Sequence, residues 1–168
     1  MSRRTRQIEG QRLTLKSARP FEEVLAAVEA EIGRPNMGTF AGQLGSAKNY
    51  AEMEGVVQKA AGKSGFIEFA RFDLGAVLRK ESGQEKPKSV RLVIGNPLVM
   101  KEMVKHVPDA GSYAPVTVLI DERADGVHLS YDTMAGFLAP YGNAEALKVA
   151  RELDAKVEKL LKTAAGVV

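Results

Sequence analysis

Residues 88–133 constrain the fold more than any other stretch, because they predict a strand, a helix and a β-hairpin in immediate succession. Alternating residues from Lys88 to Gly95 predict the strand. Asn96 and Pro97 predict the start of a helix, since Asn caps free amides and Pro fits the first helical position. Residues 116–132 alternate on both sides of Asp125-Gly126, a pair typical of a type I′ hairpin turn. A sheet with antiparallel pairing is therefore expected.

Residue patterns elsewhere predict the remaining elements. They indicate strands at 12–16 and 66–72, helices at 21–32, 50–61 and 144–165, and a short helical turn at 74–79. Residues 36–46 contain three glycines and predict a loop or a loosely ordered connection. This order predicts an α+β fold, a two-layer α/β sandwich in which helices pack on one face of a mostly antiparallel sheet of about five strands. We expect a single domain over residues 10–168, which ends in a long helix and follows a basic disordered tail at 1–9.

Composition narrows the classes of function. The 168 residues are 45% apolar, enough for a substantial core, and contain no cysteine, which excludes disulfides and thiolate metal sites. The net charge of +3 comes from the tail: without Arg3, Arg4 and Arg6, 24 − 3 = 21 basic residues face 21 acidic ones. The folded part lacks a basic stripe and tryptophan, so specific binding of nucleic acid through the tail is not favoured.

The sequence also bears on location. The basic N-terminal residues are not followed by an apolar core of the kind found in secretory signals, and no later apolar run is long enough to span a bilayer. We therefore expect a cytoplasmic protein.

One face of the predicted hairpin gathers polar side chains. A two-residue turn at Asp125-Gly126 would pair Arg123 with His128 and Asp121 with Ser130, and would place Asp132 on the same face. The opposite face is apolar and predicts core, as follows: Val116, Val118, Ile120, Val127, Leu129 and Tyr131.

The polar hairpin face has three interpretations. It is a solvated surface with cross-strand ion pairs, or a floor on which Arg123 and His128 meet an anion or the aspartates meet a cation. In the third, His128 works beside Asp121 and Asp132 as the acid or base of an enzyme on a small anionic substrate. No nucleophile with a defined spacing accompanies these residues.

Other motifs are weaker. Asn96 at the helix start is either a structural cap or part of an anion pocket at an uncovered helix N-terminus. His106 and His128 stand in no metal-ligand spacing, so no metal is expected, and Gly62-Lys63-Ser64 lacks the first glycine and the strand–helix order of a P-loop. An apolar stripe along residues 146–164 packs against the chain's own sheet or forms a subunit interface.

Three segments together resemble the domain of unknown function 302 family: Arg91-Leu-Val-Ile-Gly-Asn-Pro-Leu, Ala114-Pro-Val-Thr-Val-Leu-Ile-Asp-Glu and Asp125-Gly-Val-His-Leu-Ser-Tyr-Asp. The resemblance extends over about residues 10–140 and implies a compact two-layer α/β fold, often dimeric, with no established activity. Asn96, Pro97 and Pro115 match the family pattern, and the resemblance implies structural roles for all three.

The sequence also departs from that family. Gly95 and Val116 stand where many members carry cysteine, so no thiol chemistry transfers to this chain. Residues 37–62 and the C-terminal helix are expected to be additions to the family pattern or variants of it.

These observations predict a homodimeric, non-enzymatic module without a cofactor that binds a small ligand or a protein partner. The enzyme described above is the alternative. The candidate ligand-binding residues are Asn96, Asp121, Arg123, His128, Ser130 and Asp132.

Overall fold

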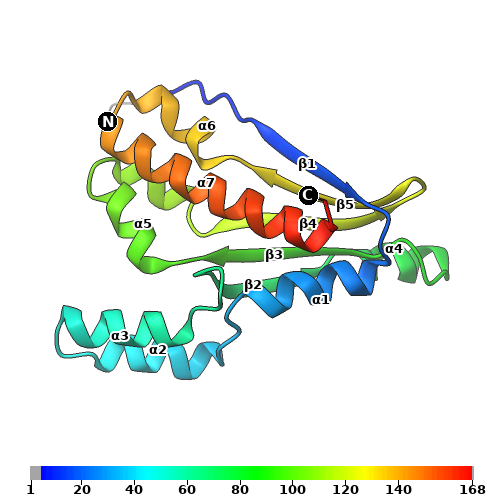
Figure 1. Ribbon diagram of the computed structural model, residues 1–168, viewed down its shortest axis with the longest axis horizontal. Helices are drawn as coiled ribbons and strands as arrows, with labels where there is room; N and C mark the ends of the chain where they lie inside the picture. The colour runs from blue at the N-terminus through cyan, green and yellow to red at the C-terminus, as the bar shows by residue number, and fades with distance from the viewer. Residues whose placement is uncertain (1–4, 168) are drawn as a thin grey trace.

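The computed structural model describes residues 5–167 and is built on a five-stranded sheet in which every neighbouring pair of strands is antiparallel (Figure 1). The strand order is β1-β5-β4-β3-β2. The strands are β1 (Arg12–Ser17), β2 (Ile67–Asp73), β3 (Ser89–Gly95), β4 (Val116–Arg123) and β5 (Gly126–Asp132). The predicted α+β class and antiparallel sheet are confirmed.

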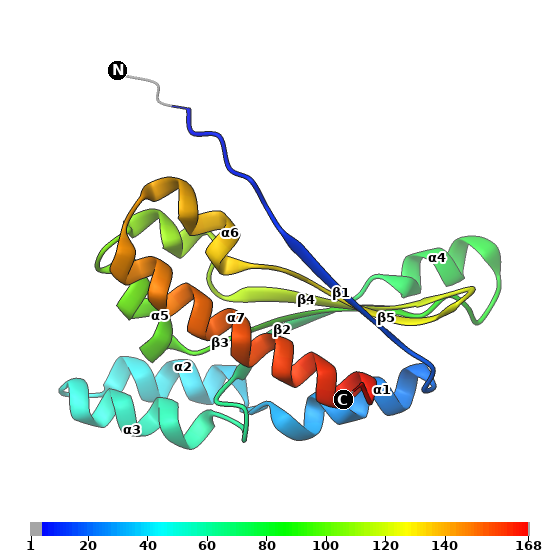
Figure 2. The same cartoon turned by 45° about the horizontal axis from the view of Figure 1, so that its top comes forward.

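Most of the helices cover one face of this sheet, whereas the helix that follows β2 projects beyond the end of the sheet (Figures 1 and 2). The helices are α1 (Phe21–Glu31), α2 (Met37–Ser46), α3 (Tyr50–Ala60), α4 (Gly75–Ser82), α5 (Pro97–Val104), α6 (Met134–Leu138) and α7 (Ala144–Ala165), with 3-10 turns at Pro108–Ser112 and Ala139–Tyr141. The long helix α7 contacts α1, α5, α6, β1 and β5. It therefore forms the centre of the helical layer.

The core lies between that layer and the inner face of the sheet. The apolar hairpin residues predicted to face the core are all buried, and Leu92 and Ile94 of β3 join them. On α7 the buried positions include Leu153, Val157 and Leu161. The apolar stripe of α7 is thus used against the chain's own sheet, which removes it as a subunit interface.

The prediction of a loop at residues 36–46 is wrong, because this segment forms helix α2. Asn36 caps the helix by accepting a hydrogen bond from the amide of Thr39 at 2.9 Å. Helical glycines cost about 1 kcal/mol each relative to alanine, but Phe40 is buried with Val57 and Ile67 in a small second core. Burial of one large aromatic side chain contributes about 1.5–3 kcal/mol and, with the cap, offsets much of that cost.

The predicted hairpin register is also wrong by two residues. The strands pair Asp121 with His128 and Arg123 with Gly126, so the turn residues are Ala124 and Asp125. Among the described residues only glycines have positive φ, and Gly126 is one of them at 135°. A type I′ turn would need positive φ at Asp125, whereas here the glycine follows the turn. The assignment of side chains to the two faces of the hairpin is still correct, because side chains alternate with a period of two and the register differs by two residues.

The N-terminal segment runs beside α6 and the start of α7. Within it, Arg6 donates a hydrogen bond to the carbonyl of Pro140 at 2.7 Å and lies over the ring of Tyr141. Residues 1–4 of the predicted basic tail, among them Arg3 and Arg4, lie outside the described residues. Between residues 5 and 167, no helix has both the length and the apolar character needed to cross a membrane.

A candidate ligand pocket on the outer face of the sheet

The outer face of the sheet carries a row of side chains that crosses all five strands. Successive Cα partners in this row are Thr14, Ser130, Leu119, Arg91 and Phe72. Asp132 lies two residues after Ser130 on the same face of β5, and its partner on β1 is Arg12. Polar and apolar groups from distant parts of the sequence therefore meet on the face opposite the helical layer.

A pocket of about 440 Å³ lies on this face; we call it the outer-face pocket. Sheet residues form its floor, and the segments before β4 and after β5 form one wall. Its lining residues are Arg12, Leu74, Arg91, Ser112, Tyr113, Pro115, Val116, Thr117, Leu119, Ser130, Tyr131, Asp132, Met134 and Phe137.

The two arginines of the outer-face pocket differ in their partners. Arg12 donates to both carboxylate oxygens of Asp132, from Nε at 2.6 Å and from Nη2 at 2.8 Å. These hydrogen bonds hold the pKa of Asp132 below its ordinary value. Arg91 lies over the ring of Phe72 at 4.9 Å, and no carboxylate of residues 5–167 forms an ion pair with it. The pocket thus contains one neutral pair and one uncompensated cation.

An aromatic pair forms the wall beyond the start of β4. The rings of Tyr113 and Phe137 stack at 4.9 Å between centroids and 11° between planes. The hydroxyl of Tyr113 lies 3.2 Å from that of Tyr141, and this contact raises the pKa of Tyr141. The wall is flat and apolar, which suits the body of an organic ligand.

Asp154 of α7 fixes this wall from the far side. Its carboxylate accepts hydrogen bonds from the hydroxyl of Tyr131 at 2.6 Å and from the amides of Met134 and Ala135 at 2.8 and 2.9 Å. Burial, followed by the nearby Asp154 charge, raises the pKa of the Tyr131 hydroxyl. Because the two amides begin α6, Asp154 caps the helix that carries Phe137.

The structure separates the predicted site residues. Ser130 and Asp132 line the outer-face pocket, but Asp121, Arg123 and His128 do not. Asp121 instead accepts a hydrogen bond from Nε of Arg123 at 2.6 Å. His128 Nε2 lies 2.9 Å from Asp125, and this contact and the one with Lys16 lower the pKa of Asp125 to about 2. These groups form contacts within β4 and with the turn, near the hairpin end.

Asn96 lies away from the pocket, at the start of α5. Its side-chain oxygen accepts a hydrogen bond from the amide of Leu98 at 2.9 Å, and its nitrogen donates to the carbonyl of Gly65 at 2.8 Å. Asn96 therefore caps the helix and ties it to the chain before β2.

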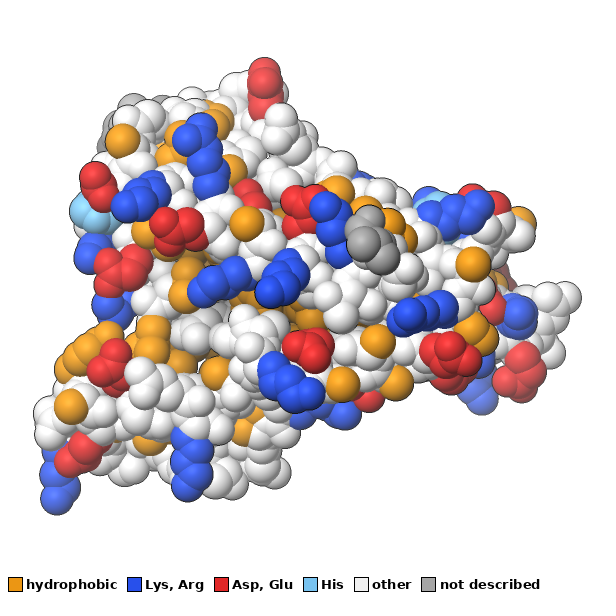
Figure 3. All heavy atoms as spheres, in the orientation of Figure 1, with side chains coloured by type: hydrophobic (Ala, Val, Ile, Leu, Met, Phe, Trp, Pro, Cys, Tyr) orange, Lys and Arg blue, Asp and Glu red, His pale blue; other side chains and the backbone are white. Residues whose placement is uncertain are grey.

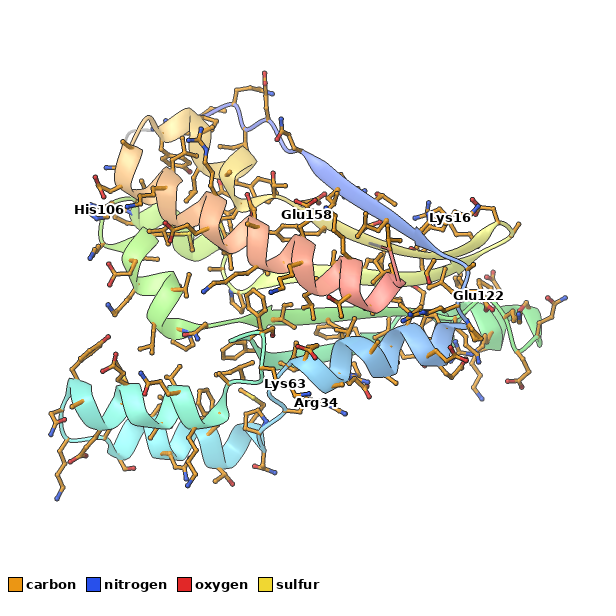
Figure 4. All side chains as sticks on the ribbon, viewed as in Figure 1. Lys16, Arg34, Lys63, His106, Glu122 and Glu158 are labelled. Atoms are coloured by element: carbon orange, nitrogen blue, oxygen red, sulfur yellow. The ribbon has the colours of Figure 1, made fainter. Side chains whose placement is uncertain are left out.

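The described residues contain no group of three or more His, Cys, Asp and Glu that could hold a metal ion. Figure 4 shows His106 at the end of the molecule opposite Lys16, the strand partner of His128. The two histidines are therefore too far apart to share a ligand. Figure 3 shows acidic and basic side chains interspersed on the helical face, without a large patch of one sign.

Sequence reasoning missed Arg91, Tyr113, Phe137 and Asp154. The outward position of Arg91 follows from the alternation of β3, but its place beside the hairpin depends on the pairing of Arg91 with Leu119. Tyr113, Phe137 and Asp154 come from three separate segments, and no spacing in the sequence links them.

Comparisons with known proteins identify the fold and a family. The family described as domain of unknown function DUF302 matches residues 42–164, well over half of the chain. A crystal structure of an uncharacterized conserved DUF302 protein from Bacillus stearothermophilus superimposes with a TM-score of 0.64 at 10% identity, over 91% of this chain and 97% of that one. No curated protein matches the chain. The matched range includes most of residues 37–62 and nearly all of α7.

Proposed function

The chain belongs to the family described as domain of unknown function DUF302, and from that premise we propose that it is a homodimeric module that binds a small anionic ligand without catalysis of its own. Arg91 carries the ligand part of this proposal. It lines a pocket of about 440 Å³ and has no acidic partner among the described residues. An arginine that has no carboxylate partner in a concave, partly apolar site favours the binding of an anionic ligand.

A thermal-shift screen of the full chain with matched anionic and neutral small molecules tests the ligand part. We expect anions alone to raise the midpoint temperature, because only a ligand that binds the folded state stabilises it. The variant Arg91→Gln should lose the shift. Arg151→Gln is the matched control, since Arg151 is exposed on α7. Equal shifts in both variants would reject the outer-face pocket as the site.

An exposed apolar patch supports the homodimer part. Most of the large apolar side chains that the described residues expose lie close together at the end of β2 and in α4; this β2–α4 patch consists of Phe72, Leu74, Val77 and Leu78. Residues 73–86 contain three acidic and three basic side chains. A surface that is apolar and balanced in charge suits a second copy of the same chain better than a nucleic acid or an anionic membrane.

Sedimentation velocity tests this contact. Val77 is 72% exposed, so Val77→Glu should leave the fold intact and convert the dimer to monomer. Tyr50→Glu changes another exposed apolar side chain, on α3, and should leave the dimer unchanged. A monomeric wild-type chain at micromolar concentration, or a dimer that survives Val77→Glu, would contradict the proposed interface.

The cytoplasmic location is also a proposal. The absence of cysteine from the sequence suits a reducing compartment. Fractionation of cells that express the untagged chain would test it, and recovery with the membrane or secreted fraction would contradict it.

A further inference from the structure

We infer that the outer-face pocket takes a monocarboxylate with an extended apolar tail, its carboxylate on Arg91 and its tail toward the Tyr113–Phe137 pair. This inference rests on the proposed function and names the chemical class of its ligand.

The charge of the pocket selects a monoanion. Its charged lining groups are Arg12, Arg91 and Asp132, which sum to one positive charge. Two donor nitrogens of Arg12 are already directed at Asp132, so Arg91 alone remains to neutralise a ligand. A dianion such as a phosphate monoester would retain an uncompensated negative charge close to the Asp132 carboxylate, and like charges at short range repel.

The shape of the guanidinium selects a planar group. Arginine presents parallel N–H donors that match the two oxygens of a carboxylate. Arg91 is anchored over Phe72 at 4.9 Å, a contact that restricts its side chain before a ligand arrives. Less conformational entropy is then lost on binding.

The length of the pocket sets the length of the tail. Arg91 is the strand partner of Leu119, whereas the aromatic pair adjoins Pro115 just before β4. Leu119 lies four positions after Pro115 along an extended strand, a span of about 13 Å at about 3.3 Å per residue. The apolar lining groups along this line are Leu119 at the Arg91 end and Pro115 beside the aromatic pair, with Thr117 between them. An apolar chain of medium length fills such a site, whereas a short acid would leave the aromatic wall empty.

Isothermal titration of the full chain with sodium octanoate tests the inference. Butyrate probes the tail, octanamide probes the charge, and inorganic phosphate probes a competing anion. We expect octanoate to bind at least tenfold more tightly than butyrate or octanamide. Arg91→Gln should weaken octanoate binding at least tenfold, Arg91→Lys should weaken it less, and Arg151→Gln should leave it unchanged.

The possible results distinguish an error in the proposed ligand class from an error in the proposed binding site. Octanamide binding equal to that of octanoate, or octanoate binding that ignores Arg91→Gln, overturns the inference. Arg91-dependent binding of phosphate with no binding of octanoate overturns the ligand class while the outer-face pocket stands as an anion site. If no anion binds in an Arg91-dependent manner, the inference and the proposed function both fail.

Discussion

Arg12 and Arg91 lie on the same face of one sheet, yet only one of them is available to a ligand. The difference lies in their strand partners. Arg12 stands opposite Asp132 and donates two hydrogen bonds to it. Arg91 stands between Leu119 and Phe72, neither of which can accept a hydrogen bond through its side chain. Strand register, more than residue type, therefore determines which cation can bind a ligand.

The Arg12–Asp132 pair should make stability depend on acid pH. The pKa of Asp132 is lower in the folded chain than in an unfolded one, where it is about 3.9. The contribution of this ion pair to the free energy of unfolding is therefore complete at pH values above the pKa of Asp132 in the unfolded chain. It is lost as the pH falls through the lower pKa of Asp132 in the folded chain. Because the Asp132 side chain is 40% exposed, Asp132→Asn should cost only about 0.2–1 kcal/mol at pH 7. Urea denaturation at pH 7 and at pH 2 measures the difference.

Glu152→Gln is the control for that experiment, since Glu152 is exposed on α7 and forms no ion pair with a described residue. A loss of stability in Asp132→Asn that is the same at both pH values would contradict the assigned ion pair.

Removal of the Asp154 carboxylate should destabilise the chain more strongly. Asp154→Ala leaves the Ala135 amide and the buried Tyr131 hydroxyl without their acceptor, and the Met134 amide keeps only its longer hydrogen bond to the Tyr131 hydroxyl, at 3.3 Å. Unsatisfied buried donors cost about 1–3 kcal/mol, and we expect a loss in that range by chemical denaturation. Asp154→Asn keeps one acceptor oxygen and should lose less. Equal stability of Asp154→Ala and the wild type would show that water replaces the carboxylate at no cost.

At the scale of elements, the α2–α3 hairpin is closed at its base by two glycines. The carbonyl of Phe66 accepts hydrogen bonds from the amides of Gly33 and Gly62, at 2.8 and 3.0 Å. A Cβ atom on Gly33 would lie 1.8 Å from the carbonyl oxygen of Ala60, and one on Gly62 would lie 2.3 Å from the carbonyl carbon of Ile32. The two ends of the hairpin approach so closely that only glycine fits.

Two alanine substitutions should therefore have opposite effects. Gly33→Ala forces backbone apart and should cost about 1–3 kcal/mol, in the range of overpacked sites. Gly42→Ala lies within α2, where an added Cβ meets nothing within 4 Å, and should stabilise the helix by about 0.5–1 kcal/mol. Thermal denaturation of both variants measures the contrast. A neutral Gly33→Ala would show that the hairpin is not held at this crossing.

The sequence predicted these elements unevenly, for physical reasons. Alternation located all five strands, because each has one buried face. Helix α2 was missed since its glycines argue against a helix, and the burial of Phe40 becomes visible only when α3 and β2 lie beside it. The predicted hairpin register was displaced by two residues because Ala124-Asp125 and Asp125-Gly126 both fit a two-residue turn. Ser130 and Asp132 were located because they belong to one hairpin, whereas Arg91 reaches the pocket only through the strand order.

At the scale of the whole molecule, the two faces of the sheet have different roles. The helical layer and the apolar stripe of α7 close the inner face. The outer face presents the pocket, and the β2–α4 patch adjoins it because Leu74 belongs to both. Ligand binding and self-association are thus both proposed on the side that the helical layer leaves uncovered.

A titration of the ¹⁵N-labelled chain with octanoate, followed through its backbone amide resonances, tests the central claim most directly. We expect the largest shifts at Arg91, Thr117, Leu119 and Ser130, with little change along the exposed side of α7. Shifts confined to the helical layer, or an unchanged spectrum at millimolar octanoate, would contradict the assignment of the outer-face pocket as the binding site.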